Sequence, residues 1–207
     1  MLQEKTQGIY LTITRGMLVQ RVKADTAGAI SRQNKNGDTV WEKEYQSIEG
    51  YIRDISTREH DYGKDWVLKM DDGKISCIVQ MGYRSGYAVC FFNRLSNLDL
   101  TKMVKLSPFI VTENDKTKSR MGIFQQGATV KSAHSKENPN GMPAMKETTF
   151  KGEQVWDDTE KWAWVEEQVK SLVWPGSADK QEANGMAEFR EEMNRAEKER
   201  YGDDLPF

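Results

Sequence analysis

Residues 65–98 read DWVLKMDDGKISCIVQMGYRSGYAVCFFNRLSNL, and their hydrophobic period changes from two to about 3.6 residues. Apolar and polar side chains alternate on both sides of Asp71–Lys74, which carries the Asp-Gly signal of a tight turn. The apolar residues that follow have the spacing of one helix face: Ala88, Phe91, Phe92, Leu95 and Leu98. This stretch therefore predicts a β-hairpin followed directly by a helix.

Strand patterns extend on both sides of this stretch. Side chains that favour strands are frequent at residues 9–23, 39–57, 103–111 and 120–130. Gly16 interrupts the first run, where we expect a bulge or kink in one long strand, and a polar turn is expected at 113–119. Several antiparallel strands, one helix and two further strands predict a mainly β protein. We expect a five-stranded Greek-key OB-fold barrel with one internal helix, and other small barrels fit the same order.

Charge divides the chain into a basic body and an acidic tail. Residues 1–136 hold 21 basic and 15 acidic side chains, whereas residues 137–207 hold 9 and 17. The overall charge of −2 hides this asymmetry, which suits a domain that binds a polyanion and carries a solvated interaction tail. We predict four parts: an OB-fold domain at 1–131, a linker at 132–156, a helical or partly disordered acidic segment at 157–201 and an acidic tip at 202–207.

Two helical patterns occur in the acidic segment. The first begins near Asp157, ends before Pro175, and has one apolar stripe, formed by Trp162, Val165, Val169 and Leu172. The second, at 182–200, is mostly polar, so we expect it to be only partly folded. A stripe at helical spacing predicts packing, here against the barrel or against a second copy, so a homo-oligomer is one of the states that the sequence allows.

The chain ends in Gly202-Asp203-Asp204-Leu205-Pro206-Phe207. This end is similar to the acidic tip of bacterial and phage single-stranded DNA-binding proteins, and residues 92–100 with 105–109 resemble the phage-encoded versions. The resemblance implies that the tip docks on replication and repair proteins. Its chemistry fits that role: Phe207 is an aromatic anchor, Pro206 limits the entropy lost on docking, and the two aspartates are attracted to a basic pocket.

A protein that binds single-stranded DNA needs cations for the phosphates and exposed rings for the bases. The body interleaves both, and we expect the DNA-binding residues to be Trp41, Tyr51, Arg53, Tyr62, Lys64, Trp66, Lys69, Tyr83, Arg84, Lys116, Lys118 and Arg120. The last three crowd one turn, so this group is favoured over any single lysine. Trp66 alternates in phase with Leu68 and Met70, which is more typical of a core position, and Phe91 and Phe92 are expected in the core.

Other features limit the classes of function. The sequence has no nucleotide-binding loop, zinc-ligand spacing or nucleophile motif, so we expect no cofactor, no metal and no enzymatic activity. Cys77 and Cys90 lie in apolar runs and are expected to be buried free thiols. With no visible signal peptide or membrane-spanning run, these thiols predict a cytoplasmic protein, in a bacterium or a phage-infected host cell.

These patterns together predict sequence-independent binding and protection of single-stranded DNA in replication, recombination or repair. Two alternatives stay open: a strand-annealing or recombination-mediator protein, and an adaptor whose barrel binds protein. The adaptor is distinguished by whether Tyr51, Arg53 and Lys118 share one exposed basic face. A nuclease would need several convergent carboxylates, which the sequence does not assemble.

Overall fold

The computed structural model describes residues 8–34, 36–135, 137–150 and 153–174 of the chain. The chain divides into two compact units, Met1–Leu172 and Val173–Phe207, and every element below belongs to the first unit. The helical pattern expected at 182–200 and the tip at 202–207 lie outside the described residues. In the described part of the chain, no helix has the length and apolar character needed to cross a membrane.

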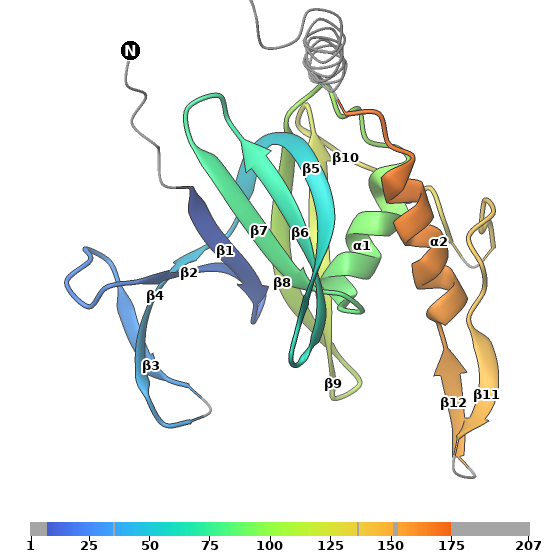
Figure 1. The fold of residues 1–207 in the computed structure, drawn as a ribbon, viewed down its shortest axis with the longest axis horizontal. Helices are drawn as coiled ribbons and strands as arrows, with labels where there is room; N and C mark the ends of the chain where they lie inside the picture. Colours follow the sequence, from blue (N-terminus) through green and yellow to red (C-terminus); the bar gives the residue numbers. More distant parts are fainter. Residues whose placement is uncertain (1–7, 35, 136, 151–152, 175–207) are drawn as a thin grey trace, which may run out of the picture. The chain divides into compact units, whose positions relative to one another are not determined.

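The first unit is built mainly from strands, as predicted (Figure 1). Ten strands form one sheet in the order β10-β9-β8-β5-β6-β7-β1-β2-β4-β3, and two others form a separate sheet. The sheet is open and has ten strands, where a closed five-stranded barrel was expected. Its strands are β1 Ile9–Thr14, β2 Met17–Val22, β3 Ile30–Gln33, β4 Thr39–Tyr45, β5 Ile48–His60, β6 Gly63–Asp71, β7 Ser76–Gly82, β8 Val104–Glu113, β9 Lys116–Gln125 and β10 Ala128–Thr129.

The N-terminal run forms two strands instead of one kinked strand. Arg15 and Gly16 have positive φ angles of 52° and 76°, the backbone of a two-residue turn between β1 and β2. A Cβ atom at Gly16 would lie 3.1 Å from Ile110 on β8, so the turn packs closely on that strand. β1 pairs in parallel with β7, whereas residues 9–23 were expected to form one strand of an antiparallel barrel.

The hairpin predicted around Asp71–Lys74 is present as β6 and β7. The Asp72 carboxylate accepts hydrogen bonds from the backbone N–H groups of Lys74 and Ile75, at 2.9 and 2.8 Å. These bonds close the turn and lower the pKa of Asp72. The Asp-Asp-Gly-Lys run is therefore a turn, as its sequence predicted.

The predicted helix follows as α1 (Gly86–Leu95) and ends three residues earlier than its apolar stripe suggested. Ser85 caps it by accepting a hydrogen bond from the Ala88 N–H at 3.2 Å. A Cβ atom at Gly86 would lie 2.3 Å from the carbonyl oxygen of Ser119. The helix therefore begins in direct contact with the backbone of β9, which only a glycine permits.

The β8–β9 hairpin has a shorter turn than the one predicted at 113–119. Asn114 and Asp115 both have positive φ, 49° and 58°, which is the backbone of a two-residue hairpin turn. Pairing continues to Glu113 opposite Lys116. The three cations predicted to crowd a loop consequently lie on strand β9, where alternation decides which face each one occupies.

Inward-facing residues of β1, β2, β5–β9 and α1 form the core. Trp66, Phe91 and Phe92 are buried there, with 1%, 0% and 4% of their surface exposed, so their predicted core positions are confirmed. Both cysteines are free and buried, also as predicted. Burial raises the pKa of the Cys77 thiol to about 11.

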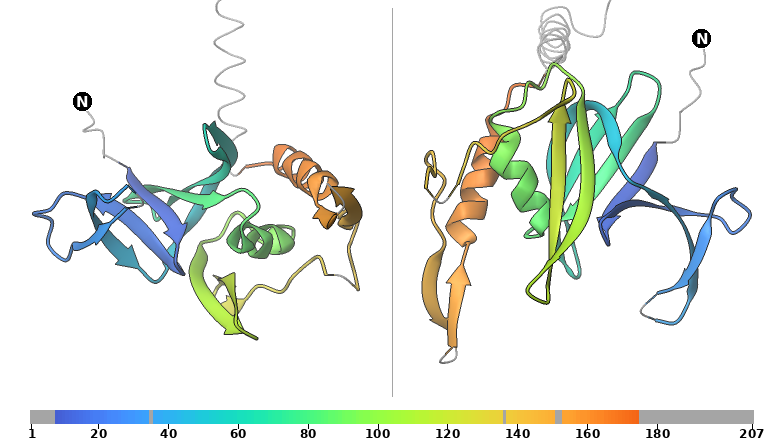
Figure 2. Two further views of the ribbon diagram at one scale, coloured as in Figure 1. Left: turned by 90° about the horizontal axis from the view of Figure 1, so that it is seen from below. Right: turned by 180° about the vertical axis from the view of Figure 1, so that it is seen from behind.

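A second helix, α2 (Thr159–Lys170), packs on the same core beside α1 (Figure 2). Trp162 is 2% exposed, and its ring centroid lies 6.4 Å from that of Trp66 and 6.1 Å from that of Phe92. Val165 and Val169 are also buried, which confirms most of the predicted stripe. The separate sheet, β11 (Lys146–Phe150) with β12 (Glu153–Asp157), lies just before α2, and all of it except Asp157 falls in the range predicted as a linker.

Candidate nucleic-acid interface

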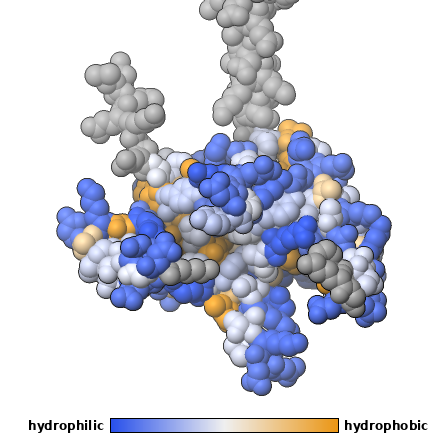
Figure 3. Space-filling model, turned by 60° about the horizontal axis from the view of Figure 1, so that its bottom comes forward, coloured by the Kyte–Doolittle hydropathy of each residue, from blue (hydrophilic) through white to orange (hydrophobic). Residues whose placement is uncertain are grey.

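The distal part of β8 and β9 is a two-stranded ribbon. β5 pairs with β8 only as far as Leu106, opposite Ile48, whereas β8 and β9 stay paired to the turn. Pro108 lies in β8 just beyond the last β5 pair, where the missing N–H costs no hydrogen bond to β5. Figure 3 shows the ribbon projecting, with a hydrophobic patch near its base and hydrophilic side chains toward its tip.

Alternation gives the ribbon two different faces. Leu106 pairs with Ile123 and Pro108 with Met121, and these four residues are buried. The residues between them point the other way, toward solvent. We call this second surface the ribbon face, and it consists of Lys105, Ser107, Phe109, Val111, Glu113, Lys116, Lys118, Arg120, Gly122 and Phe124.

Two phenylalanines supply the rings of the ribbon face. Phe109 is 44% exposed and lies directly opposite Arg120. Phe124 is half-buried, and a Cβ atom on Gly122 would lie 2.9 Å from its ring. Gly122 therefore leaves the space in which the Phe124 ring rests against the backbone of β9. Both rings are held by strand pairing, so a base that stacks on them meets a surface that is already ordered.

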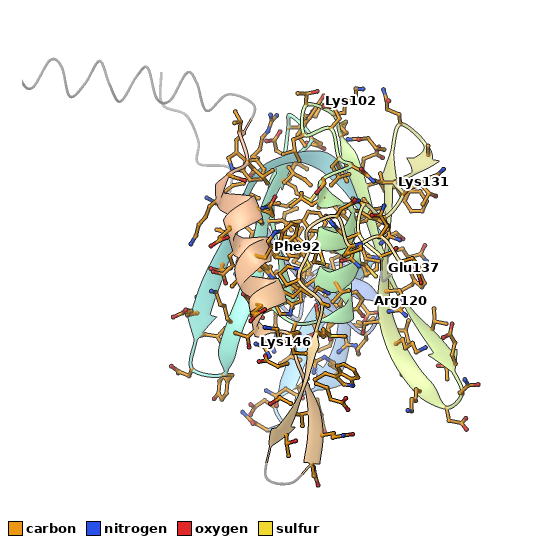
Figure 4. The ribbon with its side chains drawn as sticks, turned by 90° about the vertical axis from the view of Figure 1, so that its right-hand side faces the viewer. Phe92, Lys102, Arg120, Lys131, Glu137 and Lys146 are labelled. Atoms are coloured by element: carbon orange, nitrogen blue, oxygen red, sulfur yellow. The ribbon has the colours of Figure 1, made fainter. Side chains whose placement is uncertain are left out.

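The cations of the ribbon face differ in how they are compensated. Lys118 forms an ion pair with Glu113 at 2.7 Å, and this contact lowers the pKa of that carboxyl group. Lys105, Lys116 and Arg120 have no ion-pair partner within the described ranges. Figure 4 shows Arg120 on the side of the molecule formed by β9 and β10. Three uncompensated cations on one ribbon attract a polyanion.

Helix α2 covers several of the residues predicted to bind DNA. The Trp66 ring is buried and stacks on Tyr83, with the centroids 5.3 Å apart. The Tyr83 hydroxyl donates to Glu166 at 2.5 Å, and Lys64 pairs with the same carboxylate at 2.5 Å. Burial and the Glu166 contact raise the pKa of Tyr83. Trp66 thus presents no ring to a strand in this conformation.

The same helix compensates Arg84. The Arg84 guanidinium lies 2.9 Å from Asp158, at the start of α2, and 3.5 Å from the Thr159 hydroxyl. Together with Glu166, this carboxylate cancels positive charge that the sequence analysis assigned to DNA. The helix at the start of the acidic segment therefore packs against the body, which is one of the two packings that its apolar stripe predicted.

The predicted residues of β5 and β6 are compensated as well. The Arg53 guanidinium lies 4.7 Å from the centroid of the Tyr51 ring and binds Asp71 through two contacts, at 2.6 and 3.1 Å. This pairing lowers the pKa of Asp71 and raises that of Arg53. Lys69 pairs with Asp54 at 2.9 Å. Arg53 and Lys118 are both compensated, so Tyr51, Arg53 and Lys118 do not form the single exposed basic face that was expected of a DNA-binding barrel, and for these three residues the test favours the protein adaptor.

The last two predicted residues lie apart from these groups. Trp41 is half-buried on β4, opposite Val22 on β2 and Ser31 on β3. Tyr62 is 96% exposed at the turn between β5 and β6. The predicted residues thus occupy several places in the fold, and the β9 group shares its face with the rings of Phe109 and Phe124.

Sequence reasoning predicted only the three β9 cations of the ribbon face and missed its other residues, among them Lys105, Phe109, Val111 and Phe124. The alternation in β8 was visible, because a lysine at 105 and a phenylalanine at 109 share a phase. The residues that lie opposite them on β9 could not be identified, because the turn was predicted too long and the pairing register depends on the length of the turn. A two-residue turn at Asn114–Asp115 would have paired Phe109 with Arg120 directly.

Comparison with protein-family models, with curated proteins and with solved structures finds no match for this chain. Within the described ranges, no three His, Cys, Asp or Glu side chains lie close enough together to hold a metal ion. The predicted partner-binding residues, Asp203–Phe207, lie outside the described part. The interpretation of the interface therefore rests on the residues of this chain.

Proposed function

We propose that this chain binds single-stranded DNA without sequence preference and that the ribbon face is its principal contact. The observation that carries the proposal is the combination of two rings and three uncompensated cations on one face of the β8–β9 ribbon. Cations follow the phosphates, and each base stacked on a ring contributes about 1–3 kcal/mol. Such a protein coats and protects strands exposed in replication, recombination or repair.

The rings favour a single strand over a duplex. In a duplex the faces of the bases are stacked on one another and are not accessible to Phe109 or Phe124. Cations bind either form, because both carry phosphates. A preference for the single strand is therefore expected to depend on the rings, and overall affinity to depend mainly on Lys105, Lys116 and Arg120.

The strand order supports an OB-fold relationship for part of the sheet. β5, β6 and β7 are joined by hairpins, and β8 returns through α1 to pair with β5, which gives the spatial order 8-5-6-7. This is the order of a Greek key. We infer that β5–β9 and α1 are an OB-type module to which β1–β4 have been added, and OB-folds bind nucleic acids through a sheet face and its neighbouring loops.

The tip supplies the second half of the proposal. Asp203, Asp204, Leu205, Pro206 and Phe207 resemble the ends of single-stranded DNA-binding proteins, and they combine an aromatic anchor with negative charge. We propose that they recruit replication or repair proteins to the coated strand, in the cytoplasm of a bacterium or a phage-infected cell.

Fluorescence anisotropy with a labelled oligopyrimidine tests the proposal. We expect micromolar or tighter binding that weakens steeply with salt, and clearly weaker binding to a duplex of equal length. Equal affinity for duplex, or no binding at roughly 50 mM salt, contradicts the proposal. The rate at which the protein pairs complementary strands then separates coating from annealing.

A further inference from the structure

A surface of different character lies where α1, α2 and β12 meet. A cavity of about 480 Å³ opens there, with Met142, Met145 and Trp156 among its apolar lining residues. Its volume is in the range of ligand-binding pockets, about 300–1,000 Å³. Trp156 and Met145 are 66% and 51% exposed. Large apolar side chains exposed around a cavity are typical of interaction sites.

Two polar groups line the same cavity. The Oδ1 atom of Asn93 is buried and has no hydrogen-bond partner among the described residues. The half-buried Lys161 ammonium lies 5.6 Å from the centroid of the Trp162 ring, and burial lowers its pKa. An acceptor and a donor in an apolar cavity complement a peptide group, which offers both an N–H and a carbonyl.

The charges around the cavity favour a cationic partner. Residues 146–161 carry five acidic and three basic side chains. Lys146 is already paired with Glu160 and Asp158 with Arg84, which leaves Glu147, Glu153 and Asp157 without an ion-pair partner among the described residues. The remaining negative charge attracts a basic segment and repels both a DNA strand and the acidic tip of this chain.

The hairpin beside the cavity also offers free strand edges. Among the described strands, β11 and β12 pair only with each other. Each strand therefore has an outer edge of backbone N–H and carbonyl groups, which is the template for adding a strand from another protein. Val155 and Trp156 are consecutive in β12 and point to opposite faces, and only Trp156 lines the cavity.

We propose that the cavity and the β11–β12 hairpin together bind an extended, basic segment of a partner protein. A large apolar residue of that segment enters the cavity against Trp156 and Met145, and Asn93 and Lys161 bind its backbone. Lysine or arginine residues beside this anchor meet the acidic side chains of the hairpin and of the start of α2. Methionine adapts to anchors of different shape. This surface is separate from the ribbon face and goes beyond DNA binding.

Selection of a random-peptide library on the whole chain tests this proposal. The enriched peptides are expected to carry net positive charge and one large apolar residue. Trp156→Ala should weaken them about tenfold, whereas Val155→Ala, on the opposite face of the same strand, should leave their affinity unchanged. Comparing the unchanged protein with Trp156→Ala also identifies peptides that bind the acidic tip instead of the cavity. Such peptides bind both proteins equally, because both carry the tip.

Asn93→Ala provides a second variant whose signature a purely structural role would not give. Because Oδ1 has no partner in the free protein, its removal should leave the melting temperature unchanged or raise it, while peptide affinity falls. A lowered melting temperature with unchanged peptide affinity would assign Asn93 to the fold alone and remove it from the proposed site.

Several other outcomes overturn the proposal. Selected peptides that are acidic, that bind Trp156→Ala with unchanged affinity, or that fail to enrich at all would show that the surface is not a site for basic peptides. Self-association that Trp156→Ala abolishes, measured by sedimentation velocity, would identify a second copy as the occupant. A fivefold loss of oligonucleotide affinity in Trp156→Ala would assign the surface to DNA, and unchanged affinity keeps the two proposals independent.

Discussion

The β8–β9 and β11–β12 hairpins are both antiparallel ribbons, yet they differ in charge and in how they are anchored. The first is continuous with the ten-stranded sheet through β5, and its inner face is part of the core. The second pairs with no other described strand and leads directly into α2. The first carries uncompensated cations beside its rings, whereas acidic residues surround the exposed tryptophan of the second.

This difference shows that the same local structure serves two kinds of recognition. An exposed ring beside cations suits a nucleic-acid strand, because bases stack and phosphates are attracted. An exposed ring beside carboxylates repels that strand and suits a basic peptide. The division of charge seen along the sequence is therefore reproduced within one compact unit, since α2 and β11–β12 belong to the same unit as the sheet.

The largest effect is expected at Trp162, which anchors α2 beside the β11–β12 hairpin. We call this hairpin the acidic ribbon and the β8–β9 hairpin the basic ribbon. Trp162→Ala removes a ring that is 2% exposed and packs on Trp66 and Phe92, so the free energy of unfolding should fall by about 3–5 kcal/mol. Trp156→Ala is the matched control, because its ring is 66% exposed and its loss should change stability little. Chemical denaturation measures both variants.

The Trp162 variant also tests whether the two ribbons are independent. At a temperature where it stays folded, peptide binding to β11–β12 should be lost while oligonucleotide affinity is retained. A parallel loss of both affinities would show that the ribbons act as one site and would break the comparison.

Charge reversal on the basic ribbon should have the next largest effect. Lys116→Glu combined with Arg120→Glu removes two of its three uncompensated cations, and we expect a loss of about 100-fold in oligonucleotide affinity with a salt slope smaller by about 1.4. Lys102→Glu combined with Lys146→Glu is the control. It changes the net charge by the same amount, but at two lysines that are already paired with Asp99 and Glu160. Equal losses in both double variants would indicate that only net charge matters.

Much of the fold followed from local patterns. Alternation and the Asp-Gly turn located β6 and β7, and the change of period located α1. The pairing of β1 with β7 could not be predicted, because a parallel contact between distant segments leaves no mark on the spacing within either one. The expected barrel therefore included residues 9–23 as one antiparallel strand, whereas the structure forms β1 and β2 from them.

The candidate site was less accessible to sequence reasoning than the fold. Residue type identified Lys64 as a cation, but its partner Glu166 lies 102 positions away, so its compensation depends on the packing of α2. Phe109 was passed over as an ordinary strand residue. β5 begins at Ile48, opposite Leu106, so the part of β8 beyond Leu106 pairs with β9 alone. Phe109 lies in this part and is exposed.

The rings of the ribbon face are tested by truncation. Phe109→Ala should weaken oligonucleotide binding by about tenfold, the loss of one stacked base, with little change in the salt slope because no charge is removed. Ile110→Ala is the control, since Ile110 is next in sequence, has a similar exposure of 42% and points to the other face. An unchanged affinity in Phe109→Ala, or an equal loss in Ile110→Ala, would leave the preference for single strands unexplained.

The smallest effect concerns the one compensated cation of the basic ribbon. Glu113→Gln frees Lys118 from its 2.7 Å ion pair, so oligonucleotide affinity should rise about two- to threefold and the salt slope should increase by up to 0.7. Because Lys118 lowers the pKa of Glu113, the carboxylate stays charged at neutral pH, and the unmodified protein gains the same affinity only when pH falls through that lowered pKa. Glu147→Gln removes an equal charge from the acidic ribbon and should leave DNA binding unchanged. If Glu113→Gln and Glu147→Gln raise oligonucleotide affinity equally, negative charge acts on DNA binding at long range. The two hairpins would then differ less in DNA binding than their local contacts indicate.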